Sequence, residues 1–247
     1  MVMRVHLVAA GKFHDIDFAR LELLKLLAEH ADIRTSVSSD YADLGALAAA
    51  DLLITYTCDL MPRPDEADAL AAFLARGGRW LALHGTNSAL EPLADGTVRT
   101  PDAAPAVTAM LGTRFAAHPP IGTFKVFVTN GDHQMTRGLR DFRIEDELYL
   151  TRRTGEIDVL LHTQFTGDCP EFEDRSWDEA EVPVLYERKV GAGAVLYLTL
   201  GHCRGHYDLV PIAGFWPHPQ RCGWNYPVFY ELLRRGIAWG RPHADGC

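Results

Sequence analysis

Two histidines stand directly after apolar runs, where a buried strand would give way to a loop. His84 follows the apolar run 79–83, and His202 follows the run 194–200 and one glycine. A neutral imidazole can act as a base or as a metal ligand near neutral pH. We therefore take His84 and His202 as candidate catalytic residues. The alternative is a histidine that is hydrogen-bonded to a neighbouring loop for structural reasons.

The run Asp146-Glu147-Leu148-Tyr149 offers a carboxylate to the same chemistry. If the run is extended, alternation sends Asp146 and Leu148 to one face and Glu147 and Tyr149 to the other. We expect Glu147, beside Tyr149, to be the carboxylate that enters a pocket. The alternative is a solvated acidic pair, which is a common surface feature.

Together, His84, Glu147 and His202 make a set of two histidines and one carboxylate. Such a set can bind a divalent metal such as zinc, or it can share acid–base work without a metal. The residue types fit both roles equally.

Four further polar residues follow strand-like runs and could contact a substrate. His14 and Asp15 follow the first apolar run, while Cys58 and Asp59 follow the run 51–56. In open parallel sheets, ligands bind beyond the carboxyl ends of the strands, so these residues are placed to share one pocket with the histidines. The alternative for Asp15 is that it caps the next helix.

Histidines and aromatic residues later in the chain are weaker candidates for substrate contacts. His118 precedes two prolines, which form a rigid extended turn that could hold it over a pocket or could merely set the path of a loop. His206, Trp216 and Trp224 could help to form a stacking wall for a sugar ring, but aromatic residues at such positions are often core.

A second, separate metal pattern is present near the C-terminus. Cys203-x-x-His206 followed by His218-x-x-x-Cys222 imitates the ligand spacing of a structural zinc site. Such spacings also arise by accident in a chain rich in histidine, and we favour that explanation.

These residues must be positioned by the elements between them. Apolar runs alternate with amphipathic segments in the first half, which predicts a parallel sheet with helices on both faces. The second half is richer in strands, with long irregular stretches expected at 91–104 and 167–182. The expected strands are 5–9, 51–56, 79–83, 124–128, 159–163, 184–188 and 194–200, and the expected helices are 18–30, 64–76 and 227–239.

Composition limits the classes of function. A net charge of −9 argues against nucleic acid as a partner, since its phosphates are bound mainly by Lys and Arg. No segment approaches the roughly 20 apolar residues needed to span a bilayer. The cysteines are odd in number and scattered, which predicts reduced thiols and a cytoplasmic protein. With no internal repeat and no low-complexity linker, we expect one domain over residues 1–247.

Short motifs in a fixed order connect the chain with a known family. The motifs are 11–15, 56–59, 77–85, 111–115 with 118–120, 132–139 with 142 and 146–149, and 191–202. In this order they resemble the ThuA-like (trehalose-utilisation) family, a flavodoxin-like branch related to class I glutamine amidotransferases. The resemblance covers almost the whole chain. It implies an α/β fold, namely a flavodoxin-like three-layer sandwich with a mainly parallel central sheet.

One departure from the wider superfamily bears on activity. Glutamine amidotransferases of this fold carry a cysteine nucleophile on a tight turn between a strand and a helix. Here the run 79–83 continues into His84-Gly85-Thr86 without a cysteine. Acyl chemistry on a thiolate needs that cysteine, so the resemblance does not imply glutaminase activity.

The resemblance and the site residues together predict an enzyme of carbohydrate metabolism. We expect acid–base chemistry, with or without a metal, that hydrolyses or isomerises a small sugar, polyol or keto-sugar. The alternative is a non-catalytic sugar-binding or partner-binding module on an amidotransferase-like scaffold. A catalytic site would gather the histidines and Glu147 in one cleft, whereas a binding module could scatter them. An apolar patch on the loops of the second half could also support a homo-oligomer.

Overall fold

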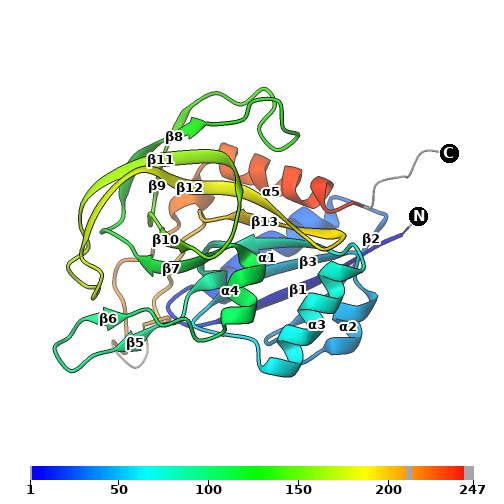
Figure 1. The fold of residues 1–247 in the computed structure, drawn as a ribbon, viewed down its shortest axis with the longest axis horizontal. Coiled ribbons are helices and arrows are strands. Elements are labelled where there is room, and N and C mark those ends of the chain that lie inside the picture. The colour runs from blue at the N-terminus through cyan, green and yellow to red at the C-terminus, as the bar shows by residue number, and fades with distance from the viewer. Residues whose placement is uncertain (1, 210–212, 242–247) are drawn as a thin grey trace.

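A mixed nine-stranded sheet is the centre of the fold in the computed structural model, which describes residues 2–209 and 213–241 (Figure 1). The strand order is β2-β1-β3-β4-β13-β12-β11-β8-β9. Adjacent strands from β2 to β13 are parallel, and those from β13 to β9 are antiparallel. The bounds are β2 (Ile33–Ser38), β1 (Met3–Gly11), β3 (Leu52–Cys58), β4 (Arg79–Leu83), β13 (Gly193–Leu198), β12 (Ser176–Val190), β11 (Asp158–Asp168), β8 (Gly122–Val128) and β9 (Phe142–Asp146).

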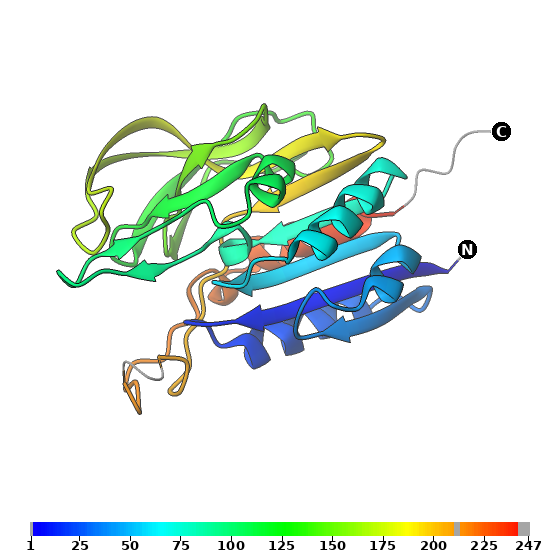
Figure 2. The ribbon, with the colours of Figure 1, turned by 60° about the horizontal axis from the view of Figure 1, so that its bottom comes forward.

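The expectation of a mainly parallel sheet is wrong for the second half of the chain. Parallel neighbours need a long crossover, usually a helix, whereas short turns join antiparallel strands. Only residues 191–192 separate β12 from β13, and no helix lies between β11 and β12. These strands therefore pair as hairpins, and Figure 2 shows the green and yellow antiparallel strands on one side of the blue and cyan parallel ones.

Helices cover both faces of the parallel half, whose strand order β2-β1-β3-β4-β13 is that of flavodoxin-like sheets. Alternation along the buried strands divides the core: Leu7 and Ile54 pack with α1 and α5, whereas Val8 and Leu53 pack with α2, α3 and α4. The bounds are α1 (Ile16–Ala28), α2 (Leu44–Ala49), α3 (Pro64–Ala75), α4 (Pro105–Leu111) and α5 (Pro227–Trp239).

Every strand and helix expected from the sequence is present, with ends shifted by a few residues. The irregular stretch expected at 167–182 is wrong, because β11 and β12 extend into it and form a long hairpin. The stretch 91–104 holds a small hairpin instead of pure loop. The remaining short elements are β5 (Glu91–Pro92), β6 (Val98–Arg99), β7 (Thr113–Ala117), β10 (Leu150–Arg153) and the 3₁₀ helices η1 (His84–Asn87) and η2 (Cys222–Asn225).

The described cysteines are free thiols, all of them buried: Cys58, Cys169, Cys203 and Cys222. Cys247 lies outside the described residues. None of the described helices is long and apolar enough to cross a membrane.

Gly193 tests how closely the parallel strands and α3 approach one another. A Cβ atom at Gly193 would lie 2.3 Å from the carbonyl oxygen of Gly78, whereas one at Gly45 would meet nothing closer than 3.6 Å. We expect Gly193→Ala to lower the free energy of unfolding by about 1–3 kcal/mol, as overpacking does. The control Gly45→Ala should change it by less than about 1 kcal/mol. Urea unfolding measures both, and equal values would contradict the packing described here.

Candidate metal centre

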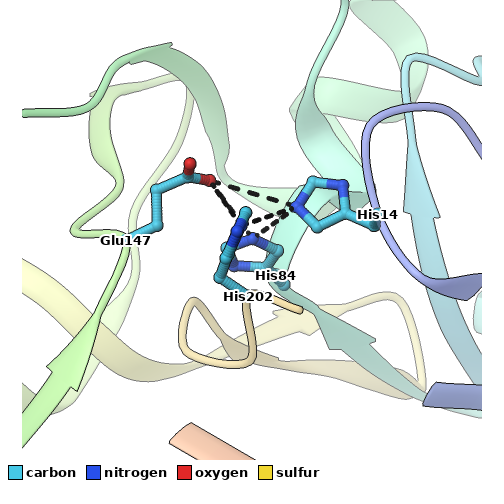
Figure 3. Close-up of side chains that lie close together, drawn as sticks. All are labelled: His14, His84, Glu147 and His202. Carbon is cyan, nitrogen blue, oxygen red and sulfur yellow. Dashed lines mark hydrogen bonds and ion pairs between the residues drawn. The ribbon is translucent and has the colours of Figure 1, made fainter. Parts of the chain in front are cut away.

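Four side chains from separate segments point toward one another at the carboxyl ends of the sheet strands (Figure 3). His14 follows β1, His84 begins η1 directly after β4, and His202 follows β13. Glu147 follows β9, which belongs to the antiparallel half. All four residues are buried, and one nitrogen or oxygen atom from each lies within 4.8 Å of those of the others.

The separations between these atoms match those around a small metal ion. His14 Nε2 lies 2.9 Å from His84 Nε2 and 3.2 Å from His202 Nδ1. Glu147 Oε2 lies 3.2 Å from His202 Nδ1, 3.5 Å from His84 Nε2 and 4.0 Å from His14 Nε2. In a tetrahedral site with bonds of about 2.0–2.1 Å, the ligand atoms are about 3.3–3.4 Å apart. The observed separations bracket that value, so the residues fit an ion of the size of zinc.

The outer nitrogen of each histidine fixes the proton of its ring. Each outer nitrogen lies within hydrogen-bond distance of a carbonyl or amide oxygen. Such an oxygen only accepts, so the outer nitrogen donates and the inner nitrogen keeps its lone pair. The pairs are His14 Nδ1 with Lys12 O (3.2 Å), His84 Nδ1 with Thr199 O (2.8 Å) and His202 Nε2 with Gln220 Oε1 (2.8 Å).

Three lone pairs and a carboxylate therefore face one another in a buried space, and a cation would remove their repulsion. Burial, with His84 and His202 nearby, holds the pKa of His14 well below its usual value. Burial alone would raise the pKa of Glu147, but His118 and His202 hold it well below its usual value. Burial alone would lower the pKa of His202, but Glu147 raises it. The centre thus has a charged carboxylate and attracts positive charge.

Asp146 holds the backbone of two of these residues in place. Its carboxylate accepts hydrogen bonds from the backbone N–H groups of Glu147 (2.8 Å) and His202 (3.0 Å). It also accepts from Gly201 (2.9 Å) and Gly223 (3.2 Å). The solvated acidic pair considered from the sequence is wrong, because both Asp146 and Glu147 are buried. Asp146 faces the backbone, and Glu147 faces the histidines.

A cavity of about 480 Å³ opens beside the centre and meets it at His14 and Glu147. His118 Nε2 lies 3.4 Å from Glu147 Oε1, and the His118 ring stacks on Tyr149 with their centroids 6.3 Å apart. Cys58 also lines the cavity. His14, Cys58, His118 and Tyr149, which the sequence suggested as substrate contacts, are thus together, and His14 belongs with the inner four.

The two aspartates expected near the substrate are occupied elsewhere. Asp15 is the N-cap of α1, accepts from the backbone of Phe18 and pairs with Arg221 at 3.0 Å. Asp59 pairs with Lys12 at 2.7 Å. Neither lines the cavity of about 480 Å³, although Asp15 lines a neighbouring one of about 630 Å³.

The later aromatic candidates lie apart from the centre. His206 stacks on Phe215 with centroids 4.9 Å apart, and its Nδ1 is 2.9 Å from the carbonyl oxygen of Trp216. His206 lines the neighbouring cavity. Trp224 is core, as its indole is 4% exposed and donates to the carbonyl oxygen of Gly201 (2.8 Å), so it leaves no face open to a sugar.

The zinc-like spacing near the C-terminus does not assemble a site. Cys203 Sγ lies 3.1 Å from the hydroxyl of Tyr56 in the core. Within residues 2–209 and 213–241, the only cluster of three or more potential ligands of suitable spacing is that of His14, His84, Glu147 and His202. The accidental explanation of the Cys203–Cys222 pattern is the one that the geometry supports.

Comparison with known proteins fixes the relationships of the chain. Residues 4–212 match the family model ThuA, described as trehalose utilisation. The chain belongs to the ThuA family. That description suggests a carbohydrate-related role, and no curated protein has a matching sequence.

Solved structures show the same fold in other ThuA-like proteins. One from Bacteroides uniformis has a TM-score of 0.65 and 16% identity, covering 96% of this chain and 91% of that one. One from Parabacteroides merdae has a TM-score of 0.60 and 16% identity, covering 97% and 90%. A protein of Salmonella typhimurium described as cytoplasmic has a TM-score of 0.56 and 14% identity, covering 96% and 97%. At these identities the likeness concerns the fold alone.

The role of Asp146 can be tested with a neutral replacement of the same size. Asp146→Asn puts an amide N–H₂ where backbone N–H groups now donate, so we expect a loss of about 1–3 kcal/mol in the free energy of unfolding. We also expect metal affinity to fall by about 10–100-fold, as for other groups that support metal ligands. The control is Glu145→Gln, one residue away and exposed on β9. Unfolding and metal titration would contradict the assignment if both variants behaved alike.

Proposed function

We propose that this ThuA family member is a metal-dependent enzyme that hydrolyses or isomerises a small sugar or keto-sugar. The observation that carries the proposal is the convergence of His14, His84, Glu147 and His202 on one buried point. Nitrogen and carboxylate donors of this kind suit zinc and related divalent metals. When bound, such a metal acts as a Lewis acid on a hydroxyl or carbonyl oxygen of the substrate.

The residues around the centre divide the remaining work. His14 and Glu147 border the cavity, so substrate would approach the centre from their side. His118 is 22% exposed and lies next to Glu147, where it can exchange a proton with the substrate. Tyr149, stacked beside His118 and 4.2 Å from the His84 ring between centroids, keeps water from the far side of the centre.

A structural metal is the main competing explanation, because sites closed by four protein ligands are usually structural. Two observations favour catalysis. The cavity, at about 480 Å³, has the size of a small-molecule site and reaches two of the four ligands. In addition, Glu147 Oε1 faces His118 at 3.4 Å instead of lying within apolar core. A sugar-binding module without turnover would share the cavity but would not need His118.

Metal content is the first test. The purified protein should hold about one equivalent of a divalent metal, and His14→Ala and His84→Ala should each lose it. His162→Ala is the matched control, because His162 lies on β11, bonded to Thr129 and outside the centre. Elemental analysis after dialysis measures all four proteins. Metal retained by both His14→Ala and His84→Ala, or a parent that takes up no metal, would refute the proposed centre.

Turnover separates catalysis from binding. His118→Asn should keep its metal and its melting temperature but lose about 10²–10⁴-fold in kcat on whichever sugar or keto-sugar the parent converts, the usual contribution of general acid–base catalysis. His162→Asn should match the parent. A library of sugars and keto-sugars, assayed by chromatography with metal present, provides the measurement. Full activity in His118→Asn would remove His118 from the mechanism, and binding without conversion would favour the sugar-binding module.

A further inference from the structure

One arginine on the wall of the cavity has no partner in the described part of the chain. Arg204 follows His202 by two residues and lines the cavity of about 480 Å³ beside His14 and Glu147. Its Nε atom is buried without a hydrogen bond. A buried donor on a charged group is costly to leave unpaired, so such a group calls for an explanation.

Neighbouring arginines do not share this property. Arg221 pairs with Asp15 at 3.0 Å, and Arg20 pairs with Asp17. No described carboxylate lies within ion-pair distance of Arg204; Asp208 is nearby, but it accepts from the backbone N–H of Gly205 at 2.5 Å. The charge of Arg204 is therefore left for something that enters the cavity.

The backbone around Arg204 is held in a fixed position relative to the metal centre. Its N–H donates to the carbonyl oxygen of Gln220 (3.0 Å), and the N–H of Gln220 donates back (2.8 Å). The side chain of Gln220 in turn holds His202 at 2.8 Å. The guanidinium also lies over the Trp216 ring, 5.6 Å from its centroid. One residue, Gln220, thus ties the arginine to a ligand of the centre.

The other charges of the cavity leave the arginine as its anion-binding group. Two carboxylates line the cavity, Glu147 and Glu171. Glu147 faces the histidines, and Glu171 is exposed to solvent. A guanidinium binds a carboxylate or a phosphate through parallel N–H donors, with a strength that neutral hydroxyls do not match.

We infer that Arg204 selects a substrate with one anionic group, a carboxylate or a phosphate, on a small carbohydrate. The anion would sit on Arg204 while another part of the same molecule reaches the metal centre past His14 and Glu147. The inference rests on the proposed function for the carbohydrate and for the centre, and it adds the charge of the substrate.

The test is calorimetric titration of the metal-loaded protein with D-glucose, D-glucuronate and D-glucose 6-phosphate. At least one of the two anions should bind about tenfold or more tightly than glucose, and the tighter one shows whether carboxylate or phosphate is the natural group. Arg204→Met should abolish this preference, and Arg204→Lys should keep part of it. Arg99→Met is the control for net charge, because Arg99 is exposed and pairs with Glu91 and Glu173.

Two results would overturn the inference. One is equal binding of the three sugars, or no binding of either anion at millimolar concentration. The other is an anion preference that survives in Arg204→Met. Metal content, measured on the same samples, keeps the two proposals apart. Loss of anion preference with metal retained concerns Arg204 alone, whereas a parent that takes up no metal refutes the centre even where Arg204 still binds the anion.

Discussion

The mutual repulsion of three imidazole lone pairs and a carboxylate is the constraint around which this site is arranged. Such groups come together in a buried space only if surrounding atoms hold them there. The oxygens of Lys12, Thr199 and Gln220 fix which nitrogen of each histidine is protonated. The repulsion is stored in the fold, and a divalent cation is the partner that relieves it.

Holding these groups together requires the two halves of the sheet to meet. β1, β4 and β13 are parallel members of one sheet, so their carboxyl ends deliver His14, His84 and His202 to one edge. Glu147 comes from the end of β9, at the far margin of the sheet. Irregular register between β11 and β12 bends these long strands, as bulges do, and the bend lets β9 return toward the parallel half. Asp146 then secures β9 to the backbone after β13.

The sequence predicted the parallel half well because its signals are local. Apolar runs and amphipathic helices repeat there, and the rule that ligands bind at the carboxyl ends of strands selected His14, His84 and His202 as residues of interest. The antiparallel half was harder, since hairpins with polar exposed faces, such as 167–182, read as loops. The part played by Asp146 could not be foreseen, because its four donors come from segments far apart in the chain.

The position of His84 shows how the fold supports different chemistry from that of its amidotransferase relatives. His84 stands at the turn after β4, where those enzymes carry a cysteine, and it adopts a left-handed backbone with φ of 44°. Gly85 permits this turn, since a Cβ atom there would lie 2.7 Å from the carbonyl oxygen of Thr57. Cys58 lines the cavity, but burial raises its pKa, so it is a poor source of the thiolate that acyl transfer needs. The strained turn is kept while its side chain has changed from nucleophile to ligand, which leaves the metal centre as the part of this site equipped for reaction.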